Sequence, residues 1–185
     1  MQQTLTKGVA GWAMLGMLVC GPCPAVAQND GDEEYRVKLA FLCNFTKFIE
    51  WPAEVYSAAT APLVICVLGQ DPFQGEIQQG LRGRTASGHP IEIKKLRPAD
   101  NPKACQIVFV RSSEKRAAVK MITAVKGSST LTIGESADFA AEGGVINFTL
   151  DDNRLGFEIN LGAASQTGVQ ISSKLLMLAK IVKER

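Results

Sequence analysis

Hydrophobic residues along this chain gather in short runs of the length of a β-strand. The run Leu63–Leu68 is almost uninterrupted and ends at Gly69, a pattern typical of a strand buried on both faces of a sheet. The runs Cys105–Val110 and Thr130–Gly134 have the same character. Ile91–Leu96 instead alternates apolar and polar residues, which predicts a strand nearer the edge of the sheet.

Segments with helical periodicity alternate with these strands. Pro52 ends the first of them, and either Ser112 or Ser113 would cap the third. The predicted helices span about residues 32–51, 72–81, 113–125 and 168–183. One broad face of the first helix is apolar, and its residues are Val37, Phe41, Leu42, Phe45, Phe48 and Ile49.

The order of these segments predicts the fold class. A succession of strand, helix, strand, helix and strand favours parallel strands joined by right-handed crossovers. The pattern then changes, because Val145–Leu150 and Leu155–Asn160, with a polar turn between them, indicate an antiparallel hairpin. We therefore predict one α/β domain over residues 28–185. Its mixed sheet has a mostly parallel core plus a C-terminal antiparallel hairpin and is flanked by helices.

Residues 1–27 have the organisation of a signal peptide. A single charged residue, Lys7, precedes the apolar stretch Gly8–Cys20, and small residues end the segment at Ala27. This apolar stretch is shorter than the roughly 18 residues that a membrane-spanning helix needs. We expect cleavage after Ala27 and a mature chain in the periplasm, an oxidising compartment in which disulfides form.

Charge and motifs exclude several classes of function. The 185-residue chain has 20 Lys and Arg against 18 Asp and Glu, a formal charge of +2, which disfavours nucleic acid as a partner. The only histidine, His89, is interpreted as a solvated loop residue, so histidine-based metal sites lack their usual ligands. No nucleophile-elbow, zinc-protease or phosphate-loop motif occurs after residue 27. We expect a binding protein without a cofactor or metal, and not an enzyme.

Five segments of the chain resemble, in the same order, those of one known family. They are Tyr35–Pro52, Leu131–Glu135, Gly143–Phe148, Gly156–Asn160 and Ile171–Leu176. Together they resemble the YfiR family (the DUF4154 type) of periplasmic regulators, over nearly the whole mature chain.

The resemblance implies a function. Such a protein binds the periplasmic sensor region of an inner-membrane diguanylate cyclase of the YfiN type and inhibits it, which lowers cyclic di-GMP and the output of exopolysaccharide and biofilm. It also implies a homodimer and sequestration by an outer-membrane lipoprotein of the YfiB type. The alternative is a periplasmic small-ligand-binding sensor module that acts on another receptor or on a transporter.

Three cysteines remain after residue 27. Cys66 and Cys105 lie in two candidate core strands and match the fold-stabilising disulfide of the family, so we expect them to pair; two buried free thiols are the alternative. The second bridge found in some family members, near Gly143, has no cysteines here. Cys43 falls on the predicted polar stripe of the first helix. It is interpreted either as a partly buried unpaired thiol or as an exposed thiol that bridges two copies.

Three polar residues near the C-terminus are candidates for partner binding. Glu158 and Asn160 alternate with Phe157 and Ile159, so they point to the opposite face of their strand. We interpret Glu158 as a partner contact or a buried hydrogen-bonding group, and a solvated sheet face is the alternative. Lys174 lies in the last segment that resembles the family and is its expected ion-pair partner.

Two residues of the first predicted helix admit alternatives. Lys38 falls on the apolar face, where an unpaired ammonium is costly. We expect its side chain to snorkel to solvent, and pairing with a carboxylate is the alternative. Trp51 and Phe48 end the helix and are expected to lie in the core. An exposed Trp51 would instead be an anchor for a partner.

Overall fold

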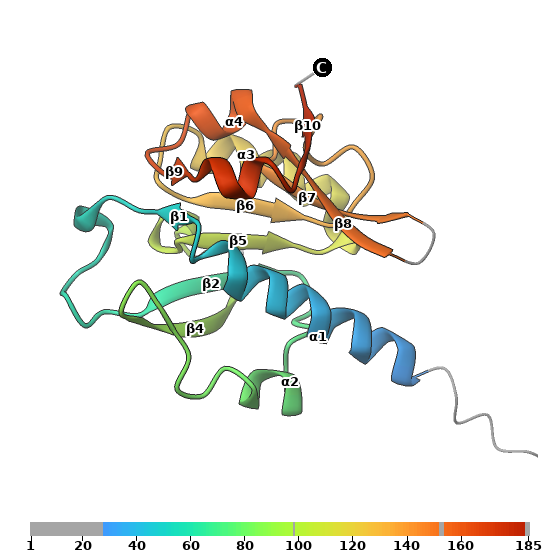
Figure 1. Cartoon of the computed structure of the whole chain (residues 1–185), viewed down its shortest axis with the longest axis horizontal. Helices are drawn as coiled ribbons and strands as arrows, with labels where there is room; N and C mark the ends of the chain where they lie inside the picture. The colour runs from blue at the N-terminus through green and yellow to red at the C-terminus, as the bar shows by residue number, and fades with distance from the viewer. Residues whose placement is uncertain (1–27, 98, 152–153, 184–185) are drawn as a thin grey trace, which may run out of the picture.

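An eight-stranded sheet forms the centre of the molecule. A computed structural model describes residues 28–97, 99–151 and 154–183, so the predicted signal peptide lies outside the described residues (Figure 1). The strand order is β10-β8-β7-β6-β5-β2-β4-β3. These strands are β2 (Leu63–Leu68), β3 (Thr85–Ala86), β4 (His89–Leu96), β5 (Ile107–Val110), β6 (Leu131–Gly134), β7 (Ile146–Asp151), β8 (Arg154–Asn160) and β10 (Lys180–Val182).

The pairing of the strands confirms the predicted fold class. From β4 through β2, β5 and β6 to β7, each strand pairs in parallel with its neighbour. β8 is antiparallel to β7, which is the predicted hairpin, and β10 is parallel to β8. A separate antiparallel pair joins β1 (Ile49–Glu50) to β9 (Gln170–Ile171). The result is a mixed α/β fold around a mostly parallel sheet.

Helices cover the two faces of this sheet. The longest helix, α1 (Gln28–Phe45), crosses one face, and α3 (Lys115–Val125) packs on the other (Figure 1). Three short helices complete the fold, namely α2 (Glu76–Gln79), α4 (Leu161–Ser165) and α5 (Ser173–Leu176). Within the described residues, no helix is both long enough and apolar enough to cross a membrane.

Aromatic rings fill the space between α1 and the sheet. The ring of Phe45 lies 4.9 Å from that of Phe157 and 5.8 Å from that of Phe148, centroid to centroid. Phe41 contacts the same two strand residues edge-on, at 6.1 Å from each. Aromatic pairs in these geometries add about 0.5–1.5 kcal/mol each to the free energy of burial. The apolar face of α1 therefore holds the helix against the C-terminal hairpin.

A disulfide lies on the face of the sheet that α3 covers. Cys66 of β2 is bonded to Cys105, which precedes β5, and their Cα atoms are 5.9 Å apart. Both residues are buried, next to Leu96 and Val108. The predicted pairing is confirmed, and it joins two neighbouring parallel strands.

The first and last predicted helices differ from the structure. α1 ends at Phe45 instead of continuing to residue 51, because the chain turns there and enters β1. The prediction of a helix over residues 168–183 is wrong. This segment forms β9, the single turn α5 and the edge strand β10, because the backbone of Lys180–Val182 pairs with β8. Hydrogen bonds from a strand far away in the sequence override the local helical periodicity.

Two smaller corrections concern helix ends. The helix predicted over residues 72–81 is limited to α2, which follows Gly75 at a φ of +64°. Neither Ser112 nor Ser113 caps α3, because both lie in a 3₁₀ turn and the N-cap position belongs to Glu114.

Candidate functional site

A strip of polar side chains crosses the three strands at the C-terminal edge of the sheet. Asn147 of β7 and Lys180 of β10 are each in register with Glu158 of β8. Their neighbours Phe157 and Ile159 belong to the core beneath α1, so the strip lies on the opposite face. The predicted alternation along β8 is confirmed.

The strip contains an unsatisfied hydrogen-bond acceptor. Asn147 is 3% exposed, and its Nδ2 donates to Oε1 of the half-buried Glu158 at 3.2 Å. The Oδ1 atom of Asn147 is buried and has no donor within the described part of the chain. A buried polar atom without a partner costs about 1–3 kcal/mol. Because the protein itself covers this oxygen, a partner on the surface does not contact it, and the half-buried Glu158 is the more accessible acceptor of the strip.

Large apolar side chains are exposed at the same edge of the sheet. Met177 and Leu178, which follow α5, are 78% and 72% exposed, and Ile181 of β10 is 46% exposed. We call these three residues the β10 edge patch. β10 is the last strand of the sheet, so its outer backbone groups are open to pairing. Exposed apolar residues next to an open strand edge are typical of a protein-binding surface.

A second organised cluster lies at the ends of β5 and β6, around Glu135. The side chain of Glu135 is only 3% exposed. It accepts hydrogen bonds from Lys38 Nζ at 2.6 Å, Tyr35 Oη at 3.0 Å, Arg111 Nε at 3.0 Å and the backbone N–H of Ser112 at 3.1 Å. The cluster thus joins α1 to the carboxyl ends of two neighbouring parallel strands.

The electrostatics of this cluster follow from its burial. Burial alone would raise the pKa of Glu135, but hydrogen bonds from Lys38 and the Ser112 backbone, together with the charges of Lys38 and Arg111, lower this pKa below its usual value. Burial and the negative charge of Glu135 raise the pKa of Tyr35 to about 12. Glu135 is therefore ionised and Tyr35 neutral at neutral pH.

The lowered pKa of Glu135 predicts how stability depends on pH. The folded state favours the ionised form of Glu135. The contribution of this carboxylate to the free energy of unfolding is therefore complete above the unfolded-state pKa of 4.5, and it is lost as the pH falls through the lower folded-state pKa. Melting temperatures of the wild type and of Glu135→Gln, measured from pH 7 to pH 3, should differ by a constant amount above about pH 5 and converge below pH 4.5. A difference that is independent of pH would contradict this prediction.

Comparison with known proteins identifies the family. A family model described as YfiR/HmsC-like (DUF4154) matches residues 35–180. This chain belongs to the YfiR/HmsC-like family. A search of curated proteins finds no match. Members of the family are periplasmic regulators of cyclic di-GMP signalling that work with signalling receptors and are not catalysts, and this chain is a regulator of that class.

The range that matches the YfiR/HmsC-like model includes both clusters. It begins at Tyr35, which donates to Glu135, and ends at Lys180 of the polar strip. Sequence reasoning did not identify the Glu135 cluster. The sequence feature that points to this cluster is the position of Lys38 on an apolar helix face, because a buried ammonium needs a carboxylate. The structure shows Lys38 paired with Glu135 and Glu34, so the expectation that it snorkels to solvent is wrong.

The other predicted partner-binding residues of this YfiR-like chain have different surroundings. Asn160 is fully buried, where Oδ1 accepts from the N–H of Ala163 at 2.9 Å and Nδ2 donates to the carbonyl of Ala140 at 2.7 Å. These bonds give Asn160 a structural role, because it caps α4. Lys174 is exposed in α5, and among the described residues no ion pair joins it to Glu158, so the expected pair is wrong.

Trp51 lines a surface hollow instead of the polar strip. The hollow has a volume of about 600 Å³, and its wall includes Tyr56 and His89. Trp51 is half-buried, and its Nε1 is buried without an acceptor among the described residues. His89 is not a solvated loop residue. It begins β4, stacks on Tyr56 at 3.7 Å between ring centroids, and places Nδ1 2.7 Å from the carbonyl oxygen of Ala61.

Cys43 is buried instead of lying on a polar stripe. It is 5% exposed, and it is a free cysteine. Burial raises the pKa of its thiol, which lowers the fraction of reactive thiolate. The structure thus shows a buried unpaired thiol, and a bridge between two copies would first require α1 to uncover it. Within the described residues, no group of three or more His, Cys, Asp or Glu side chains is placed to hold a metal.

Proposed function

We propose that this protein binds the periplasmic sensor region of an inner-membrane diguanylate cyclase and inhibits it, which lowers cyclic di-GMP and the output of biofilm and exopolysaccharide. Membership of the YfiR/HmsC-like family supports a regulator of this signalling system. The observation that carries the proposed contact is the open β10 edge with its exposed β10 edge patch, next to the strand that holds Glu158.

Inhibition by binding requires a difference in affinity between two states of the cyclase. A protein that bound the active and inactive states with equal affinity would not shift the equilibrium between them. The β10 edge patch supplies the apolar contacts, while the half-buried Glu158 supplies a polar group that fixes orientation. A sensor region whose inactive state presents a matching apolar surface and a donor would be held in that state.

Substitution in the β10 edge patch tests this proposal. Leu178→Glu places a charge in the centre of the proposed interface, and we expect binding of the purified cyclase sensor region to weaken at least about tenfold. Because Leu178 is 72% exposed, the fold should be unaffected. Binding is measured by calorimetry, and cyclic di-GMP is measured in cells that carry each variant.

Val119→Glu is the matched control, because Val119 is an apolar residue of α3 that is 52% exposed on the opposite side of the sheet from α1. It should bind and inhibit like the wild type. Deleting the gene in a strain that retains the cyclase should raise cyclic di-GMP. Unchanged nucleotide in that strain would exclude the proposed inhibition.

Two further partners belong to the same proposal. An outer-membrane lipoprotein would release the cyclase by sequestering this protein, and a second copy of the chain would form a homodimer. Co-purification from the periplasm tests the first, and light scattering of the purified protein tests the second.

One observation favours the alternative function, a sensor of small ligands that acts on another receptor or on a transporter. The wall of the hollow beside Trp51 includes the stacked rings of Tyr56 and His89, which offer an aromatic surface to a ligand. Trp12 lies in the predicted signal peptide, so Trp51 is the only tryptophan of the expected mature protein. The fluorescence of that mature protein therefore reports on this hollow. A ligand that quenches this fluorescence and changes signalling would support the alternative.

A further inference from the structure

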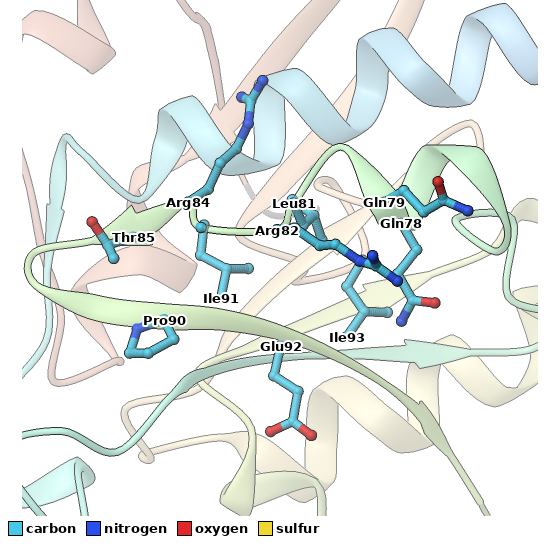
Figure 2. A pocket seen from close by; sticks show the side chains of 11 residues that line it. Gln78, Gln79, Leu81, Arg82, Arg84, Thr85, Pro90, Ile91, Glu92 and Ile93 are labelled. Atoms are coloured by element: carbon cyan, nitrogen blue, oxygen red, sulfur yellow. The ribbon is translucent and has the colours of Figure 1, made fainter.

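A groove lies beside β4, near the opposite edge of the sheet from β10. It has a volume of about 420 Å³ and lies between β4 and the segment that runs from α2 to β3 (Figure 2). Its floor is apolar. Figure 2 shows Ile91 and Ile93 rising from β4 on the side of Leu81, whereas Glu92 points to the other side of the strand. Leu81 and Ile93 are 7% and 8% exposed, so the core itself forms this floor.

The backbone of β4 is open along this groove. β2 pairs with β4 from Ile91 to Leu96, but β3 covers only His89 and Pro90 on the other side. The N–H of Ile91 donates to the carbonyl of Arg84 at 3.3 Å, so it faces away from β2. By the alternation of a parallel ladder, the peptide groups of Ile93 and Lys95 face the same way. No backbone partner for them occurs in the ranges that the structure describes.

The rim of the groove is basic. Between Gly80 and Pro90 the chain has Arg82 and Arg84 and no acidic residue. Neither guanidinium has an ion-pair partner within the described residues. Gly83, at a φ of +74°, turns the chain between them, so that Arg82 lies over β4 while Arg84 points toward α1 (Figure 2).

The groove continues beneath Arg84. A second depression of about 230 Å³ shares Leu81 and Arg84 with it and extends along Arg36 of α1 to Cys43. The exposed Lys95 lies along the other end of the β4 edge. An open strand edge with an apolar floor thus runs between cationic side chains at both ends.

We propose that this groove binds an extended acidic segment of another protein, which adds to β4 as a further strand. The peptide groups of Ile93 and Lys95 would pair with the backbone of the segment. Because side chains alternate along a strand, every second residue of the segment would face Leu81, Ile91 and Ile93. Lys95 shares the face of Ile91 and Ile93, and Arg82 lies over the same side of β4, so these two cations select carboxylates at the two ends of the apolar floor. The residues on the other face of the segment would meet the Lys94–Glu92 ion pair, whose charges cancel.

The charge of Lys95 disfavours a second copy of this chain as the occupant. Lys94 and Arg97 are paired with Glu92 and Asp100, but Lys95 is exposed and has no ion pair within the described residues. Lysines on an edge strand commonly prevent such self-association. The same charge attracts an acidic strand, so the edge favours that partner.

A labelled peptide tests the proposal without knowledge of the natural partner. The probe is a fluorescein-labelled nonapeptide with valines in its centre and glutamates at both ends, and its binding is followed by fluorescence anisotropy. We expect saturable binding that weakens as salt is added, because exposed charges are screened. The corresponding valine–lysine peptide should not bind. Arg82→Glu/Arg84→Glu should weaken binding of the acidic peptide at least about tenfold.

Two variants separate the groove from general attraction between charges. Arg116→Glu/Lys120→Glu makes the same change of charge on exposed positions of α3 and should bind the peptide like the wild type. Lys95→Pro removes one outward N–H donor and leaves the carbonyl groups of β4 in place, so it should weaken binding if a strand is added. Circular dichroism verifies that each variant is folded.

The proposal is overturned if the wild type does not bind the acidic peptide, or if the α3 variant loses as much affinity as Arg82→Glu/Arg84→Glu. Unchanged affinity in a folded Lys95→Pro variant would exclude strand addition. None of these measurements involves the β10 edge patch, so they are independent of the proposed inhibition of a cyclase.

Discussion

Replacing Glu135 with alanine should lower the free energy of unfolding of the mature protein by about 3–5 kcal/mol. The change removes the carboxylate that contacts both Lys38 and Arg111. It leaves the Lys38 ammonium, in a side chain that is 6% exposed, with Glu34 alone, and it leaves the Tyr35 hydroxyl without its acceptor. For a chain of this size, the melting temperature should fall by roughly 6–20 °C, as calorimetry would measure.

Glu34→Ala is the matched control for this prediction. Glu34 pairs with the same lysine, but its side chain is 40% exposed, so its loss should cost less than about 1 kcal/mol. The double variant Lys38→Met/Glu135→Leu should recover part of the loss, because it removes the buried ammonium together with the carboxylate. If Glu135→Ala cost no more than Glu34→Ala, the cluster would not be what fastens α1 to the sheet.

Loss of the disulfide should have the second large effect. Cys66 and Cys105 are 39 residues apart, and closing a loop of that length stabilises the folded state by about 4 kcal/mol in the chain-entropy model. Cys66→Ala/Cys105→Ala should therefore unfold at a lower urea concentration than the wild type. Alanine leaves space in a closely packed layer next to α3, which adds to the loss.

Reducing agent provides the control for this second prediction. Dithiothreitol should shift the urea midpoint of the wild type toward that of the double variant, while the double variant itself should not respond. Cys43→Ser should still respond to reductant, because Cys43 is not part of the bridge. A wild-type midpoint that is the same with and without reductant would show that the bridge does not contribute to stability.

The sheet could be predicted from the sequence because its signals are local. Leu63–Leu68 and Ile107–Val110 are continuous apolar runs, and such runs are typical of strands covered on both faces. The hairpin of β7 and β8 has a polar turn between two apolar segments. Each of these signals lies within a few residues, and each strand pairs as its pattern indicates.

The C-terminal segment could not be predicted because its structure depends on distant residues. Its apolar spacing fits a helix, but the N–H of Ser172 donates to the carbonyl of Phe48, and β10 pairs with β8. The Glu135 cluster depends on distant residues in the same way, since Lys38 and Glu135 are 97 positions apart. Only the folded sheet brings such residues together, and periodicity in a short window does not register them.

Packing explains two of the glycines in the segments that resemble the family. A Cβ atom on Gly134 would lie 2.3 Å from the ring of Phe139, and one on Gly144 would lie 2.2 Å from the same ring. Phe139 is fully buried beside the disulfide layer. The sequence alone does not explain why these positions are glycine, because the constraint comes from one aromatic ring that packs against both of them.

The strand order has a consequence for how two partners would share this molecule. β10 ends the sheet on one side and β4, with the short β3, ends it on the other. Every residue of β5 and β6, in the middle of the sheet, is buried, and the disulfide links β2 to Cys105 just before β5. Coupling between distant sites requires an element with two alternative arrangements, and a braced sheet of this kind offers none. Occupation of one edge should leave the affinity of the other unchanged, so the sheet would act as a rigid spacer that fixes the distance between two bound proteins.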